Sequence, residues 1–176
     1  TARFSPSDMS GHRTRSSVTE HAALPEAPVI YVDADACPVK EEVERVAERH
    51  GLAVWMVSNG GIRPSRNPLI RNKLVPEGPD AADDWIAETC EPKDIVITRD
   101  IPLADRCVKR GAAVIDHGGK VFDEQSIGMA LATRDLMTQL RDTGTITGGG
   151  RSFTKQDRSR FLSELETIVR RKQRGL

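Results

Sequence analysis

The stretch VIYVDADACP, residues 29–38, decides the fold of this chain because an apolar run ends there in two aspartates and a proline. The run predicts a buried strand, and the proline predicts the first turn of a helix. The stretch IVITRD, residues 95–100, repeats this pattern and places Asp100 directly after another apolar run. In open parallel sheets, ligands bind at the carboxyl ends of the strands. We therefore expect Asp33, Asp35 and Asp100 to meet at one edge of a sheet.

Strand-like apolar runs alternate with amphipathic helical patterns along most of the chain. The expected strands are residues 28–33, 52–58, 94–98 and 112–116, and the expected helices are residues 38–50, 81–90, 101–110 and a longer one that ends near residue 140. Residues 59–72 are expected to be a loop. Such alternation implies right-handed crossovers and a parallel sheet that is covered on both faces. The predicted fold class is therefore α/β, a three-layer sandwich with a mainly parallel central sheet and an added C-terminal helix.

The chain is expected to have one folded domain with appendages. Residues 1–27 are polar, lack the hydrophobic core of a signal peptide and predict a disordered tail. The α/β domain should span residues 28–140, and residues 141–153 should form a glycine-rich connector. Residues 154–176 predict an amphipathic helix whose apolar stripe packs on the domain or on a partner subunit. Three unpaired cysteines and no run of 18 apolar residues favour a cytoplasmic protein without a membrane span.

Charge is unevenly distributed along the chain. The 176 residues carry 26 basic and 26 acidic side chains, which cancel. Residues 28–142, however, hold 20 acids against 15 bases, whereas residues 151–176 hold eight bases against three acids. An acidic body with a basic arm fits a metal site beside an element that binds a polyanion. A solvated helix face explains the basic arm equally well.

Five aspartates are the candidate site residues. Asp33, Asp35 and Asp100 are joined by Asp80 and Asp83, whose i, i+3 spacing places them on one face of the helix expected at residues 81–90. So many carboxylates share one pocket only if a cation or a proton separates them. A divalent ion with oxygen ligands and an activated water indicates phosphodiester chemistry. The simpler alternative is that Asp35, Asp80 and Asp100 only cap helices.

Polar and basic side chains near the same edge are candidates for binding substrate. They are Lys40, Asn59, Arg63, Ser65 and Arg66, of which the last four lie after the second strand. Arginine binds phosphate oxygens in a bidentate manner, so this loop could bind a nucleic-acid backbone. An ordinary surface loop is the alternative.

Several motifs together resemble the YaiI/YqxD family of uncharacterised bacterial proteins over about residues 29–169. They are DADACPVK (33–40), PSRNPLIRN (64–72), DAADDWI (80–86), TRDIPLA (98–104), ATRDLM (132–137) and GGGRSFTKQDRSRF (148–161). That family looks like a branch of the PIN-like superfamily, related to NYN domains. The resemblance implies an α/β sandwich around a parallel sheet and a ribonuclease activity that depends on Mg²⁺ or Mn²⁺.

Carried over by position, the resemblance assigns roles to particular residues. Asp33, Asp80 and Asp100 would hold the metal directly or through water. Asp35 and Asp83 would be additional catalytic acids, and Thr98 would orient the water or a ligand. The family's Arg-Asp pair falls on Arg134 and Asp135, and its terminal signature falls on Asp157 and Arg158.

The sequence therefore predicts a metal-dependent ribonuclease with RNA as its partner, and it leaves self-association open. Two alternatives remain. A phosphatase of the haloacid-dehalogenase type would use Asp33 as nucleophile and Asp35 as acid. A non-catalytic module that binds RNA or regulates another protein is the second.

Overall fold

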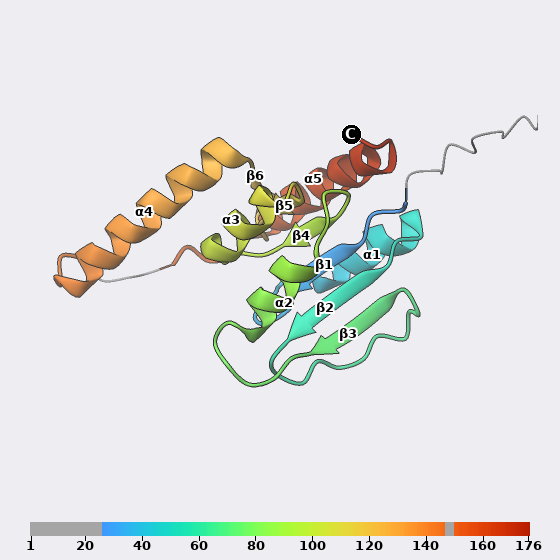
Figure 1. Cartoon of the computed structure of the whole chain (residues 1–176), viewed down its shortest axis with the longest axis horizontal. Helices are drawn as coiled ribbons and strands as arrows, with labels where there is room; N and C mark the ends of the chain where they lie inside the picture. Colours follow the sequence, from blue (N-terminus) through green and yellow to red (C-terminus); the bar gives the residue numbers. More distant parts are fainter. Residues whose placement is uncertain (1–25, 147–149) are drawn as a thin grey trace, which may run out of the picture.

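The computed structural model describes residues 26–146 and 150–176, and it shows a six-stranded sheet between two layers of helices (Figure 1). The strands are β1 (Ile30–Asp33), β2 (Val54–Ser58), β3 (Ile70–Leu74), β4 (Ile95–Ile97), β5 (Ala113–Ile115) and β6 (Val121–Phe122). The helices are α1 (Lys40–His50), α2 (Ala81–Thr89), α3 (Ile101–Lys109), α4 (Glu124–Asp142) and α5 (Lys155–Gln173). The predicted α/β class, with a mainly parallel sheet and a C-terminal helix, is confirmed.

The order of the strands places β1 at the centre of the sheet. The order is β3-β2-β1-β4-β5-β6, and every neighbouring pair is parallel except β5 and β6. Asp33 pairs with Val57 of β2, while Val32 pairs with both Met56 of β2 and Ile97 of β4. Along the chain, β2 and β3 thus lie on one side of β1, and β4, β5 and β6 lie on the other. This is the topological switch point, where a crevice opens outside the carboxyl ends of the strands.

Both faces of β1 are covered, which explains its unbroken apolar sequence. Ile30 and Val32 belong to the core under α1 and α5, whereas Tyr31 belongs to the core under α2 and α3. Alternate residues of a strand point to opposite faces, so a strand between two helical layers needs apolar residues at every position.

The C-terminal helix α5 packs on the body of its own chain. Phe161, Leu165, Ile168 and Val169 are buried in the same core as the inner face of α1. A polar contact adds to this packing, because the Arg158 guanidinium donates to the buried Glu42 carboxylate (2.8 Å) and to the Pro38 carbonyl (3.0 Å). The apolar stripe predicted from the sequence therefore closes one face of the sheet.

One strand lies where a loop was expected. Residues 70–72 belong to β3, which pairs with β2 along five residues, so the loop prediction for residues 59–72 is wrong at its C-terminal end. β3 is an edge strand whose Arg71 and Asn72 are exposed, so its sequence lacks the apolar run of a buried strand. The Arg71 guanidinium lies 5.6 Å from the centre of the Trp55 ring on β2, a cation–π contact across the pair.

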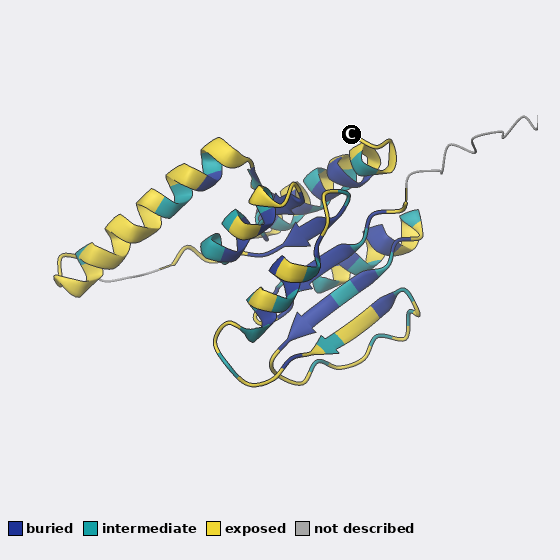
Figure 2. Cartoon of the chain, viewed as in Figure 1, coloured by how far each residue is buried: buried dark blue, intermediate teal, exposed yellow. Residues whose placement is uncertain are grey.

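Helix α4 extends away from the sheet and is exposed over most of its length (Figures 1 and 2). Ile127 is its only buried residue, and Arg134 and Asp135 are both exposed. No helix in the described ranges is long and apolar enough to cross a membrane. The predicted tail lies outside the described residues except for residues 26 and 27, as does the middle of the predicted connector.

Because α5 packs on the core and α4 is mostly exposed, truncating an apolar side chain should lower the free energy of unfolding far more on α5 than on α4. Phe161 is fully buried, and replacing it with alanine should lower the free energy of unfolding by about 3–5 kcal/mol. Leu136 on α4 is 53% exposed, so Leu136→Ala should change it by less than about 0.5 kcal/mol. Urea denaturation followed by circular dichroism measures both. Equal losses in the two variants would show that α5 does not close the core.

Candidate acidic site at the carboxyl edge of the sheet

Thr98 links the end of β1 to the turn before α3. Its fully buried hydroxyl donates to Oδ2 of Asp33 (3.0 Å) and accepts from the backbone N–H of Asp100 (3.0 Å). This arrangement fixes the carboxylate of Asp33 at the end of the central strand. Thr98 was predicted to orient a water or a ligand, and the side chain that it orients in the structure is Asp33.

Asp100 is the N-cap of α3. Its Oδ1 accepts the backbone N–H of Leu103 (2.9 Å), which satisfies one of the unpaired donors at the start of the helix. Asp100 therefore caps a helix, as the simpler interpretation of the sequence predicted. Capping uses only one carboxylate oxygen, however, and the charge of Asp100 still acts on Asp33 and Asp83.

Asp83 lies at the centre of the acidic cluster. Burial, together with the charges of Asp100, Asp33 and Asp80, raises its pKa to about 6. Burial also raises the pKa of Asp33, against the hydrogen bond from Thr98, and the charges of Asp35 and Asp100 add to that rise. Carboxylates from β1, α2 and the β4–α3 turn thus lie close enough together for neighbouring charges to add to the raised pKa values of Asp33 and Asp83.

Asp80 and Asp84 differ in their surroundings, although both lie at the start of α2. Asp80 occupies the N-cap position but makes no side-chain capping hydrogen bond, so its carboxylate is not used to begin the helix. Asp84 instead pairs with Arg106 of α3 at 2.7 Å on the surface. The charge of Asp80 acts on Asp83 within the cluster, whereas Asp84 pairs with the neighbouring helix.

Asp35 holds a turn and does not cap a helix. Its Oδ1 accepts from the Ser58 hydroxyl (2.8 Å) and its Oδ2 accepts from the backbone N–H of Asn59 (3.3 Å). Helix α1 begins after Val39 without a side-chain cap, so the capping alternative for Asp35 is wrong. The reason is tertiary, because parallel pairing of β1 with β2 brings the end of β2 next to Asp35.

The donor set has the chemistry of a hard-cation site. All its members are carboxylates, and within residues 26–146 and 150–176 none of Asp33, Asp80, Asp83 and Asp100 forms an ion pair with a basic side chain. In the same residues no three His, Cys, Asp or Glu side chains are arranged closely enough to enclose a metal ion. Mg²⁺ typically binds proteins through one or two carboxylates and keeps several waters, and this open arrangement fits that mode.

The predicted substrate-binding residues fall into two groups. Asn59 and Ser65 hold the β2–β3 loop in place, because Asn59 Nδ2 donates to the Gly78 carbonyl (3.2 Å) and the Ser65 hydroxyl donates to Glu44 (3.2 Å). Arg63 and Arg66 are exposed on that loop. Lys40 begins α1 near the same edge of the sheet. Burial raises the pKa of the Cys37 thiol, and the charges of Lys40 and Asp33 both act on that thiol, so the two residues lie close to the same point.

Sequence reasoning missed a second group of polar residues beside the acidic cluster. Arg99, His117, Arg151 and Arg160 line one cavity, although they come from three separate segments. Nothing in their spacing indicates a site. The only local signal is the turn DHGGK, residues 116–120, whose two glycines let the chain approach another element closely.

Known proteins resemble this chain over the whole region that carries both groups. A family model described as "Uncharacterized BCR, YaiI/YqxD family" matches residues 31–171. A UPF0178 protein of Parvibaculum lavamentivorans is 62% identical over 80% of this chain and 92% of that protein. A UPF0178 protein of Mesorhizobium japonicum is 60% identical over 82% of this chain and 94% of that protein. A UPF0178 protein of Agrobacterium fabrum is 56% identical over 84% of this chain and 97% of that protein. No solved structure matches the chain significantly. The chain therefore belongs to the YaiI/YqxD family, as its motifs predicted.

Proposed function

We propose that this protein hydrolyses RNA phosphodiester bonds at the acidic site with the help of Mg²⁺ or Mn²⁺. The observation that carries the proposal is the convergence of Asp33, Asp83 and Asp100 from β1, α2 and the β4–α3 turn at the switch point of a parallel sheet, where burial, and then neighbouring carboxylates, raise the pKa values of Asp33 and Asp83. Such an arrangement is unfavourable for folding, and a bound cation removes the penalty. Functional sites are where proteins keep unfavourable charge clusters of this kind.

Each acid has a defined share in the proposed site. Asp33 and Asp100 each use one oxygen within the protein, toward Thr98 and Leu103, and keep the other oxygen for an ion or its water. Asp80 is proposed to act through a water of the ion, and Asp83 is proposed as a further water-mediated contact or a proton acceptor. A bound divalent ion would supply a more acidic water and neutralise charge on the phosphate. Thr98 keeps Asp33 in position, and Asp35 keeps the β2–β3 loop in position.

An acidic cluster repels a polyanion, so a nuclease of this kind needs basic groups around it. Arg63 and Arg66 on the β2–β3 loop and Lys40 at the start of α1 are the proposed contacts to the RNA backbone. Contacts to phosphates position a strand without reading its sequence. We therefore expect binding that depends on salt more than on base sequence.

The geometry of Asp35 disfavours the phosphatase alternative. That mechanism needs the second acid of the D-x-D pair to face the substrate as a proton donor, but both oxygens of Asp35 face the turn at Ser58 and Asn59. A non-catalytic RNA-binding module would not need the acids at all. Replacing the acids one at a time therefore distinguishes the ribonuclease, the phosphatase and the non-catalytic RNA-binding module.

Cleavage should require the acids of the cluster. Asp33→Asn and Asp100→Asn should each lower the rate of Mn²⁺- or Mg²⁺-dependent cleavage of mixed RNAs by at least about a hundredfold, the scale for losing one electrostatic group at a reacting phosphate. Asparagine is also a good N-cap, so Asp100→Asn should keep α3 intact. Asp84→Asn on α2 is the matched control and should cleave normally. Cleavage that survives Asp33→Asn, or that needs no metal, would sink the proposal, and a trapped phospho-aspartate at Asp33 would favour the phosphatase.

Stability should depend on pH through Asp83. Its pKa is raised from 3.8 to about 6 in the folded protein, so its contribution to stability is present below 3.8 and is lost as the pH rises through 6. In EDTA, Asp83→Asn should therefore raise the urea midpoint relative to the wild type at pH 7 but not at pH 4. Saturating Mg²⁺ should raise the midpoint of the wild type more than that of Asp83→Asn. Asp84→Asn, which removes an acid paired with Arg106, should not reproduce this pattern.

RNA binding should weaken when the loop loses charge. Arg66→Gln should reduce affinity about equally for different RNA sequences and lower the slope of log affinity against log salt by about 1. Arg141→Gln on the exposed end of α4 should leave both unchanged. Fluorescence anisotropy with the catalytically inactive Asp33→Asn protein measures binding without cleavage. The same slope in both arginine variants would place the RNA elsewhere.

A further inference from the structure

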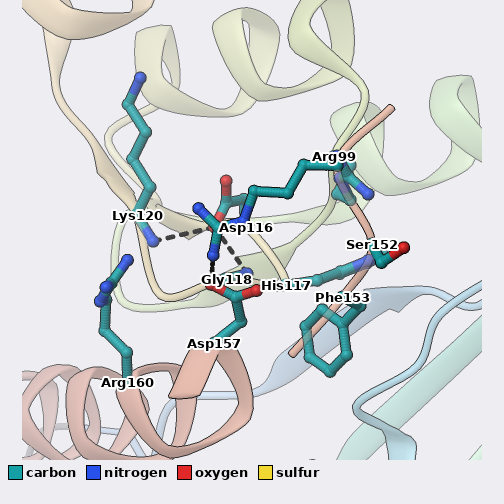
Figure 3. Close-up of a pocket in the computed structure, with 10 residues that line it drawn as sticks. Arg99, Asp116, His117, Gly118, Lys120, Ser152, Phe153, Asp157 and Arg160 are labelled. Carbon is teal, nitrogen blue, oxygen red and sulfur yellow. Dashed lines mark hydrogen bonds and ion pairs between the residues drawn. The ribbon is translucent and has the colours of Figure 1, made fainter. Parts of the chain in front are cut away.

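A cavity of about 270 Å³ lies next to the acidic site, on the basic side of the β4–α3 turn. Three segments form its walls: this turn with Arg99, the β5–β6 turn with His117 and Gly118, and the segment from Arg151 into the first turns of α5 with Arg160 (Figure 3). Arg99 stands between Thr98 and Asp100 in the sequence. The cavity and the acidic site therefore share one turn.

The two acids of the cavity make hydrogen bonds within the protein. Oδ1 of Asp157 accepts from Arg151 (2.7 Å), and its Oδ2 accepts from the backbone N–H and hydroxyl of Thr154 in a capping box (3.0 and 2.9 Å). Oδ1 of Asp116 accepts the backbone N–H groups of Gly118 and Lys120 (2.8 and 2.9 Å). Asp157 therefore uses both of its oxygens, whereas Asp116 uses only Oδ1 within the described residues.

Two arginines of the cavity keep their charge available to a ligand. Among the residues that the structure describes, neither Arg99 nor Arg160 forms an ion pair. Figure 3 places them on opposite sides of the cavity, with Asp116 and Gly118 between them. Lys120 contributes less, because its ammonium lies 5.3 Å from the centre of the Phe122 ring and its side chain points away in Figure 3. The cavity therefore has an excess of positive charge.

His117 supplies the observation that points to a ligand. Its side chain is only 4% exposed, and neither ring nitrogen has a hydrogen-bond partner within the described part of the chain. Burial and the charge of Arg99 lower its pKa to about 4, so the ring is neutral at pH 7 and presents one N–H donor. Buried polar groups without partners are rare and costly, and those at sites are often satisfied by a ligand.

The walls of the cavity are held in a fixed position by Gly119. This residue has a φ of +87°, and a Cβ added there would lie 2.8 Å from the backbone of Arg160 and Phe161. Glycine is required both for this backbone conformation and for the close contact of the β5–β6 turn with α5. The turn and the helix are therefore in direct contact, and the site is formed before any ligand arrives.

We propose that this cavity binds a phosphate group, with Arg99 and Arg160 as charged donors and His117 as a neutral donor. Guanidinium groups match the oxygens of a phosphate in geometry and charge. The phosphate could belong to a nucleic-acid strand that continues across the acidic site, or to a small phosphorylated compound. The proposal does not rest on hydrolysis at the acidic site.

The test is a titration of the full chain with inorganic phosphate at constant ionic strength, followed by NMR of the backbone amides and histidine rings. The wild type should show saturable shifts at His117, Gly118 and Gly119. Arg160→Gln should weaken the affinity about tenfold, as expected for one charge-assisted hydrogen bond. Arg171→Gln, an exposed arginine on the same helix outside the cavity, is the matched control and should bind as the wild type does.

Several outcomes decide the proposal. Absent or non-saturable shifts at the cavity, or equal affinities in Arg160→Gln and Arg171→Gln, would overturn it. If Arg160→Gln fails to fold, Arg99→Gln replaces it with the same expected loss. Asp33→Asn should bind phosphate within about twofold of the wild type, so a failure of the ribonuclease proposal leaves this result intact.

Competition identifies the source of the phosphate. An oligoribonucleotide without terminal phosphates should displace inorganic phosphate if the site holds a phosphodiester of a strand. A nucleoside 5′-monophosphate should displace it, and the oligoribonucleotide should not, if the site holds a small compound. Displacement by neither probe would mean that the arginines do not recognise phosphate esters, and the proposal would fall.

Discussion

Parallel pairing of β1 with both β2 and β4 is the constraint on which the rest of this structure depends. Parallel strands end at the same edge, so the pairing brings Asp33 within a hydrogen bond of Thr98, although 65 positions separate them in the sequence. It also brings Asp35 to the end of β2. Helices α2 and α3 then add Asp83 and Asp100 from the neighbouring crossovers. The acidic cluster is thus a consequence of strand order.

Such a cluster works against folding, and the rest of the domain must offset its cost. Burial and neighbouring charges raise the pKa values of Asp33 and Asp83, which means that their ionised forms are unfavourable in the folded protein. Two apolar cores, one under α1 and α5 and one under α2 and α3, supply the compensating stability. A charge arrangement that is maintained at the expense of stability is typical of sites that bind an ion or substrate.

Two environments of opposite charge lie on either side of a single turn. Asp100 belongs to the acidic cluster and Arg99 to the basic cavity, although they are consecutive residues. Neighbouring side chains at the end of a strand point in different directions, so one turn can contribute to two sites. An acidic centre thus lies beside a basic cavity, and the two fields have opposite sign.

Local sequence patterns were sufficient to predict the α/β class, the strand that ends at Asp33 and the start of α3 at Asp100, because periodicity and capping are properties of neighbouring residues. The same patterns missed β3, whose exposed edge position allows a polar sequence, and the capping alternative that they offered for Asp35 is wrong. They also gave no role to His117, which packs beside Arg99 and α5 only in the folded chain. By itself the sequence determined the alternation of strands and helices and the acids at the strand ends. Only the tertiary structure decided which oxygens are engaged and which charges lack a partner, since these depend on contacts between segments that are distant along the chain.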